Sequence, residues 1–173
     1  MEIFLIRHTR TDVAPGTIYG HSEVPLHADF EKEGNTILQK LPAAVDAVYS
    51  SPATRCSLLA GYIGATVMFD ERLREFNFGR WEGKTWDTIP AGERDAWMND
   101  FVHVATPQGE SLLQMNERVQ QFWQELLQAP YQTIAVVTHA GVIRLVMAAL
   151  EGLPLASIFT IPVEYGQIFR VQC

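Results

Sequence analysis

The chain has 173 residues, a formal net charge of −7 and a hydrophobic fraction of 47%. These values predict one globular domain, spanning residues 1–173, and they argue against general nucleic-acid binding, which needs a basic face. A local cluster of arginines can still bind a small anion. We expect neither a membrane-spanning helix nor a signal peptide, and the two cysteines offer no disulfide framework, which is typical of a cytoplasmic protein.

Hydrophobic periodicity, with glycine and proline as breaks, predicts strands that alternate with helices. Strands are expected at 1–7, 44–49, 66–69, 133–138, 158–161 and 168–171. Helices are expected at 30–41, 52–63, 111–128 and 141–150, with an interrupted helix at 85–103. Long loops follow the first and third strands, at 9–25 and 70–83. This order indicates an α/β fold with a mostly parallel central sheet that helices cover on both faces.

The start of the helix at 52–63 has a recognisable signal. Serine followed by proline is favourable there, so Ser51 is expected to cap the helix and Pro52 to occupy its first position. The apolar positions of the helix predict a buried face made of Leu58, Leu59, Tyr62 and Ile63.

Polar side chains follow three of the predicted strands at the point where each strand ends. Arg7 and His8 close the first strand, and Arg55 lies one turn into the helix after the second. His139 follows the strand at 133–138. Because ligands bind outside the carboxyl ends of strands in open α/β sheets, we expect these side chains to meet at one edge. This set of side chains suits phosphoryl transfer: two guanidinium groups hold the phosphate oxygens, one imidazole attacks phosphorus and the other imidazole stabilises the transferring group.

Phosphoryl transfer from a monoester also needs a proton for the leaving oxygen. A carboxylic acid supplies it near neutral pH when burial raises the pKa of the acid. The loop at 70–83 offers three candidates, Glu71, Glu75 and Glu82. Glu75 lies next to Phe76, in a stretch whose aromatic residues would desolvate it.

Six short motifs are spread in order along the chain. They are Leu5-Ile6-Arg7-His8, Ser50-Ser51-Pro52-Ala53-Thr54-Arg55, Leu73-Arg74-Glu75, Phe78-Gly79-Arg80-Trp81-Glu82-Gly83, Gly109-Glu110-Ser111 and Val137-Thr138-His139-Ala140-Gly141. The series resembles the histidine phosphatase superfamily, the phosphoglycerate mutase-like proteins. The resemblance implies a three-layer α/β/α sandwich and neither metal nor cofactor. The sequence agrees, since it holds no CxxC, no HExxH and no histidine-rich tract.

The resemblance also implies a role for each principal residue of the site. His8 corresponds to the nucleophile that becomes phosphohistidine, and Glu75 to the proton donor. Arg7, Arg55 and His139 correspond to the phosphate pocket.

The segment after the nucleophile departs from the family pattern. Thr9 stands where glycine is usual, and Arg10 replaces the usual glutamate and is expected to add positive charge near the mouth of the site. Thr11 keeps the hydroxyl of the pattern and is expected to bind phosphate. Ala14 occupies the place of a further asparagine ligand, which is therefore left unassigned.

The compact length and the segment 16–26 are similar to those of the short bacterial α-ribazole phosphatases, which remove the 5′-phosphate from α-ribazole phosphate during assembly of the cobalamin lower ligand. There is little room for a large cap between Glu75 and Gly109, and a small cap favours water as the second acceptor, and so hydrolysis. A phosphoglycerate mutase or a broad-specificity phosphatase of the same family is one alternative. A non-catalytic phosphate-binding module, suggested by the missing glycine and asparagine, is another. The expected partner is a small phosphomonoester, and no oligomeric state is predicted.

Three tryptophans, Trp81, Trp86 and Trp97, allow two interpretations. They either stack on a benzimidazole-like ring of the substrate or belong to the core.

Overall fold

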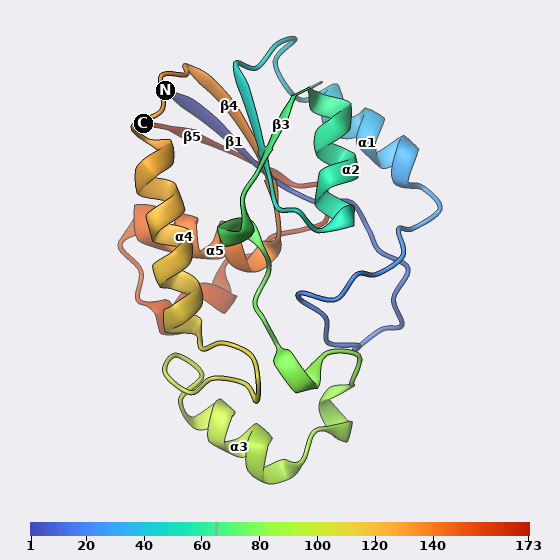
Figure 1. Cartoon of the computed structure of the whole chain (residues 1–173), viewed down its shortest axis with the longest axis vertical. Coiled ribbons are helices and arrows are strands. Elements are labelled where there is room, and N and C mark those ends of the chain that lie inside the picture. Colours follow the sequence, from blue (N-terminus) through green and yellow to red (C-terminus); the bar gives the residue numbers. More distant parts are fainter. Residues whose placement is uncertain (65) are drawn as a thin grey trace.

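A five-stranded sheet in the order β3-β2-β4-β1-β5 forms the centre of the structure (Figure 1). The computed structural model describes residues 1–64 and 66–173. Its strands are β1 (Glu2–Arg7), β2 (Ala47–Ser50), β3 (Val67–Phe69), β4 (Thr133–Thr138) and β5 (Ile168–Gln172). The first four run parallel, and β5 pairs antiparallel with β1. The predicted mostly parallel sheet is confirmed.

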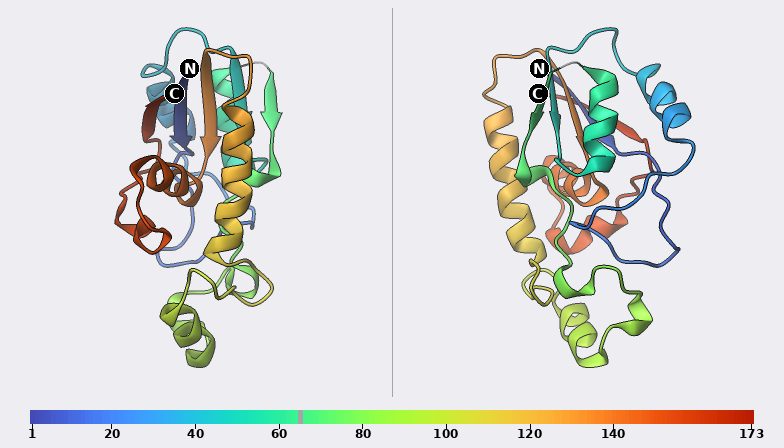
Figure 2. Two further views of the ribbon diagram at one scale, coloured as in Figure 1. Left: turned by 90° about the vertical axis from the view of Figure 1, so that its left-hand side faces the viewer. Right: turned by 45° about the vertical axis from the view of Figure 1, so that its right-hand side comes forward.

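Helices cover the sheet on both faces (Figure 2). They are α1 (Phe30–Leu38) and α2 (Thr54–Ile63) on one face, and α4 (Leu112–Leu126) and α5 (Ala140–Glu151) on the other. The strands serve both layers because successive side chains point to opposite faces. Ile3 and Leu5 pack in the core with α4 and α5, whereas Phe4 and Ile6 pack in the core with α1 and α2. The three-layer arrangement is therefore as predicted.

An extension lies beyond the carboxyl ends of the strands and carries the short helix α3 (Ala91–Asn99) (Figure 1). The interrupted helix expected at 85–103 corresponds to a 3-10 turn at Trp86–Thr88 followed by α3, with the interruption at Pro90 directly before α3. No residue of α3 is buried. The core of the extension is Trp81, which is fully buried and meets Trp86 and Trp97 edge to face. Trp81 thus follows the core interpretation.

Helix α2 differs from prediction in its start and in its buried face. The residue before its first turn is Ala53, and no side chain caps it. The expected cap, Ser51, instead uses its hydroxyl for a hydrogen bond with His139, described below. The buried residues of α2 are Arg55, Cys56, Leu59 and Ala60. Of the residues expected inside, Leu58 and Tyr62 are 47% and 38% exposed, and Tyr62 packs edge to face on Phe30 of α1.

The segment 158–161 is not a strand. Residues 158–160 lie within a 3-10 helix at Leu155–Thr160 that begins after Pro154, and Ile161 follows it. The expected pairing with the last strand is not formed: β5 pairs with β1, and Ile158 packs in the core with residues of α5 instead. Ile158 is buried all the same, which explains why its neighbourhood has the composition of a strand.

The remaining boundaries agree to within a few residues, and Ser111 caps α4 through its side chain. No helix among the described residues has the length and apolar character needed to cross a membrane.

Candidate active site

The carboxyl ends of the neighbouring strands β1 and β4 bring two histidines together. Arg7 pairs with Thr138 in the parallel register, so His8 and His139 each follow the end of a strand at the same level of the sheet. Their ring centroids lie 5.2 Å apart, with the rings nearly perpendicular. Exposed fractions of 2% for His8 and 0% for His139 put both imidazoles out of contact with bulk water.

A cavity of about 260 Å³ opens at this edge of the sheet. Five of the six predicted site residues line it: Arg7, His8, Arg55, Glu75 and His139. They come from β1, α2, the loop after β3 and the start of α5, which is the convergence that the strand-end pattern predicts. The sixth residue, Thr11, lies elsewhere.

Both arginines are oriented by backbone carbonyls. Arg55 is fully buried, and its terminal nitrogens donate to the carbonyls of Ser22 and Gly20 at 3.0 and 2.5 Å. Arg7 donates to the carbonyl of Val163 at 2.6 Å, and its guanidinium lies 3.8 Å from the centre of the Tyr165 ring.

Each of these two arginines also has one donor without a partner in the described part of the chain. The Nε atoms of Arg7 and Arg55 are buried and have no hydrogen-bond partner among the described residues. Buried donors in proteins are nearly always paired. Two arginine side chains that line one cavity favour an anion with several oxygens, such as phosphate, as its ligand.

The His8 ring is held as a neutral imidazole. Burial lowers its pKa to about 3; the hydrogen bond to the Thr9 carbonyl acts against this shift, and the charges of Arg55 and Arg7 add to it. That hydrogen bond joins Nδ1 to the carbonyl oxygen at 2.7 Å. Because a carbonyl only accepts, Nδ1 carries the proton and Nε2 carries the lone pair. A neutral imidazole with a free lone pair is a nucleophile.

His139 is also kept neutral. Burial lowers its pKa well below the usual value, and the neighbouring His8 and Arg55 add to the effect. Its Nε2 lies 2.8 Å from the hydroxyl of Ser51 and 3.5 Å from the thiol of Cys56. Burial raises the pKa of that thiol, so Cys56 stays protonated beneath the ring.

Two backbone amides hold the carboxylate of Glu75, which lines the cavity. Its carboxylate accepts from the N–H groups of Phe76 at 2.9 Å and Gly141 at 3.2 Å. Gly141 lies in the first turn of α5. A Cβ atom at position 141 would overlap the carboxylate, so glycine is what allows this approach.

The other two carboxylates of the loop lie away from the cavity. Glu71 is exposed and pairs with Arg74. Glu82 accepts from the backbone amides of His21 and Ser22, and so holds the loop whose carbonyls orient Arg55. Burial alone would raise the pKa of Glu82, but the hydrogen bonds from Ser22 and His21 lower it overall. Of the three candidates, Glu75 is the one in the cavity.

The segment after the nucleophile is arranged differently from expectation. The Thr11 hydroxyl is hydrogen-bonded to the hydroxyl of Tyr19 at 2.8 Å and lines an adjoining hollow, so its role as a phosphate ligand stays a prediction. Arg10 does not add an uncompensated charge at the mouth, because it forms ion pairs with Asp29 and Glu33 before and within α1.

A second, mostly apolar cavity of about 180 Å³ adjoins the first. Tyr19, Glu75, Phe78 and Arg144 line both. The rest of its wall is made of Phe76, Trp97, Phe101, Leu112, Met115, Gly141, Ile158 and Phe159. Sequence reasoning missed Arg144, although its position four residues after Ala140 at the start of α5 puts both on one face of the helix.

The sequence of the chain is similar to those of known proteins along nearly its whole length. The chain matches the family described as histidine phosphatase superfamily (branch 1) over residues 3–173. It is 30% identical to the adenosylcobalamin/alpha-ribazole phosphatase of Escherichia coli K12 over 176 residues, which cover 96% of this chain and 87% of the relative. It is 28% identical to phosphoserine phosphatase 1 of Hydrogenobacter thermophilus over 171 residues, 92% of this chain and 81% of the relative.

Among solved structures, the alpha-ribazole phosphatase of Shigella flexneri superimposes with a TM-score of 0.91 at 28% identity, covering 99% of this chain and 90% of that one. A family match that spans nearly every residue places the chain among enzymes and sets aside a non-catalytic phosphate-binding module. The chain therefore belongs to the histidine phosphatase superfamily and is a phosphatase.

Proposed function

We propose that this chain is a metal-independent phosphomonoesterase that acts as one domain through a phosphohistidine intermediate, with α-ribazole 5′-phosphate as its first candidate substrate. The observation that carries the proposal is the neutral, buried His8 imidazole in a cavity that two arginines, Arg7 and Arg55, also line. A place in cobalamin lower-ligand assembly and a cytoplasmic location belong to the same proposal and rest on the sequence.

In the first half of the reaction, Arg7 and Arg55 hold the non-bridging oxygens of the phosphoryl group, and His139 contacts the same group from the start of α5. Nε2 of His8 attacks phosphorus, so that an N–P bond forms as the ester O–P bond breaks. Glu75 gives its proton to the leaving oxygen.

In the second half, the Glu75 carboxylate accepts a proton from a water molecule. The water oxygen attacks phosphorus, the N–P bond breaks, and inorganic phosphate leaves. His8 is again neutral and Glu75 is again protonated, so the cycle is complete and no redox step or metal ion is required.

The apolar cavity supports an aromatic leaving group. Glu75 must contact the leaving oxygen, and Glu75 lines both cavities, so the rest of the leaving group extends from the phosphate site into the second cavity. Six aromatic side chains line that space, which suits a flat apolar ring such as a benzimidazole. Trp97 is one of them, in keeping with a stacking role for this tryptophan. The alpha-ribazole phosphatase relatives point the same way.

Arg144 favours a second candidate, a small phosphomonoester with a carboxylate on its leaving group. Its Nε donates to the carbonyl of Ile161 at 2.9 Å, and its side chain lines both cavities. A guanidinium beside the leaving-group cavity is suited to a carboxylate. Phosphoserine and phosphoglycerate carry such a group, and one of the relatives is named as a phosphoserine phosphatase.

The test is a comparison of kcat/KM for α-ribazole 5′-phosphate, phosphoserine, 3-phosphoglycerate and p-nitrophenyl phosphate, each with and without EDTA. We expect α-ribazole 5′-phosphate to exceed the next substrate at least tenfold, which corresponds to about 1.4 kcal/mol of transition-state discrimination. Higher turnover of phosphoserine would favour the second candidate. Isomerisation of 3-phosphoglycerate without release of phosphate would identify a mutase and contradict the proposal.

Two variants test the mechanism. His8→Ala should abolish hydrolysis and the acid-labile phosphoenzyme, whereas His103→Ala, which removes an exposed histidine, should leave both unchanged. Hydrolysis that persists in His8→Ala, or that EDTA abolishes in the wild type, would show the mechanism to be wrong.

A further inference from the structure

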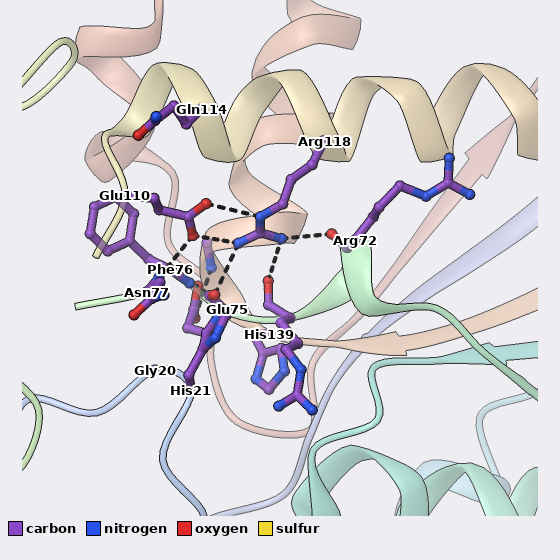
Figure 3. A network of polar contacts seen from close by, with 12 residues as sticks. Gly20, His21, Arg72, Glu75, Phe76, Asn77, Glu110, Gln114, Arg118 and His139 are labelled. Atoms are coloured by element: carbon purple, nitrogen blue, oxygen red, sulfur yellow. Dashed lines mark hydrogen bonds and ion pairs between the residues drawn. The ribbon is translucent and has the colours of Figure 1, made fainter. Parts of the chain in front are cut away.

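Arg118 of α4 has a hydrogen-bond partner for each of its five N–H groups (Figure 3). Nε and one Nη2 hydrogen donate to the two carboxylate oxygens of Glu110, at 3.0 and 2.6 Å. The three other hydrogens go to backbone carbonyls. A guanidinium has five donors in a fixed planar fork, so this arrangement uses its full capacity in one geometry.

The three carbonyls belong to the segment that carries the candidate proton donor. Arg118 donates to the carbonyl oxygens of Arg72 at 2.7 Å, Arg74 at 2.8 Å and Glu75 at 3.0 Å. On the other side of Glu75, the carboxylate of Glu110 accepts from the N–H of Asn77 at 2.8 Å. The backbone is therefore held at Glu75 itself and on both sides of it.

The pair is mostly shielded from water, since the side chains of Arg118 and Glu110 are only 20% and 14% exposed. Bidentate pairs between arginine and carboxylate are among the stronger and more directional polar contacts in proteins. Residues 72–77 are otherwise a loop and a 3-10 turn, without a strand or helix to fix the position of Glu75. The Arg118–Glu110 pair supplies that rigidity from α4.

We propose that Arg118 and Glu110 are positioning residues for proton transfer by Glu75. The inference rests on the proposed function, in which Glu75 protonates the leaving oxygen. Neither residue lines the cavity that holds His8, so both act through the backbone around Glu75. A displacement of a reacting group by about 1 Å can cost about a hundredfold in rate, so loosening this segment should slow the step that needs the Glu75 proton.

Dependence on the leaving group separates this role from a purely structural one. Nitrophenolate leaves as a stabilised anion and needs little protonation, whereas phenolate is about as basic as the tyrosine side chain, whose pKa is about 10. Phenyl phosphate and p-nitrophenyl phosphate differ by one substituent, and both present an aromatic ring to the apolar cavity. A displaced Glu75 should therefore slow the first ester far more than the second.

The experiment measures the first-turnover rate of phenol or nitrophenol release by rapid mixing, which isolates phosphorylation of His8. In Arg118→Lys and Glu110→Gln, we expect phenyl phosphate to slow at least tenfold more than p-nitrophenyl phosphate. Lysine keeps the charge but has three donors in place of five, and glutamine keeps the shape but loses the charge. Glu75→Gln provides the reference and should have the same selectivity.

Glu125→Gln is the matched control, because Glu125 of α4 is likewise an acid paired with an arginine, Arg72 of this loop, but has no hydrogen bond or ion pair with residues 74–77 in the described part of the chain. Its ratio of the two rates should stay within twofold of the wild type. Equal slowing of both esters in Arg118→Lys and Glu110→Gln, with selective loss in Glu75→Gln, would overturn the inference alone. Equal slowing in Glu75→Gln would overturn the role of Glu75 and the inference with it. If Arg118→Lys does not fold, as judged by circular dichroism, Glu110→Gln decides the outcome.

Discussion

Burial of a neutral His8 should make the stability of the folded chain depend on pH. The pKa of His8 is lowered to about 3 in the folded protein, mainly by burial. In the unfolded chain the pKa of His8 returns to the ordinary value for histidine, 6.5. Below that value the unfolded state binds a proton at His8 that the folded state does not bind. The contribution of His8 to the free energy of unfolding is therefore complete above pH 6.5 and is lost as the pH falls towards 3.

The size of the effect follows from these two values. Between about pH 7.5 and about pH 5, the unfolded His8 becomes protonated while the folded one stays neutral, which costs about 2 kcal/mol of unfolding free energy. His139 should add to the loss in the same direction, because burial also lowers its pKa. His8→Gln replaces the imidazole with an amide that does not titrate, and so removes the contribution of His8 alone.

The assay is urea unfolding of the wild type and of His8→Gln at both pH values, in buffers free of phosphate and sulfate so that anion binding does not stabilise the folded state. The wild type should lose about 2 kcal/mol more than His8→Gln on acidification. Equal losses in the two proteins would refute the reasoning, since they would mean that His8 titrates alike in both states.

Two further substitutions test the loop around the site. A Cβ atom at Gly20 would overlap the carbonyl of Phe76, so Gly20→Ala should lower the free energy of unfolding by about 1–3 kcal/mol, measured by thermal unfolding. Because the Gly20 carbonyl orients Arg55, the same change should raise KM more than it lowers kcat in steady-state kinetics. An unchanged KM would contradict this. Arg10→Ala removes the ion pairs of Arg10 with Asp29 and Glu33 on the protein surface, so kcat/KM should stay within twofold of the wild type. A larger fall in kcat/KM would place Arg10 in the site.

The parts of the fold and site that could be predicted are those with a local signal. Arg7-His8 and His139 were identifiable because each follows an apolar run that ends abruptly, and parallel strands then bring such ends to one edge of the sheet. The segment 158–161 was not, because an apolar run reads equally well as a strand or as a buried 3-10 turn. What decides between them is the packing of Ile158 in the core with residues of α5, which is a property of the tertiary structure.

Arg118 shows the same limit within the site. Three of its partners are backbone carbonyls 43 to 46 residues earlier in the chain, and a carbonyl has no residue identity for a sequence pattern to detect. Arg10 misled in the opposite way, since its neighbours in sequence suggested a charge at the mouth, whereas its partners lie 19 and 23 residues further on. Side-chain roles set by distant backbone are therefore the part that needed a structure.

The placement of β1 has a consequence for how an active enzyme is made. The strand that delivers His8 leaves the ribosome before the other strands, yet its two neighbours in the sheet are β4 and β5, the last two strands in the chain. The apolar residues 3–6 of β1 therefore stay unpaired until β4 and β5 have been made, and until then they are exposed to aggregation or to chaperones. The anion site cannot form in a partly made chain, because it needs both β1 and β4. The proposed phosphate binding would therefore mark chains whose long-range strand pairing is complete. We expect phosphate in a refolding buffer to stabilise the folded chain late rather than to guide early folding.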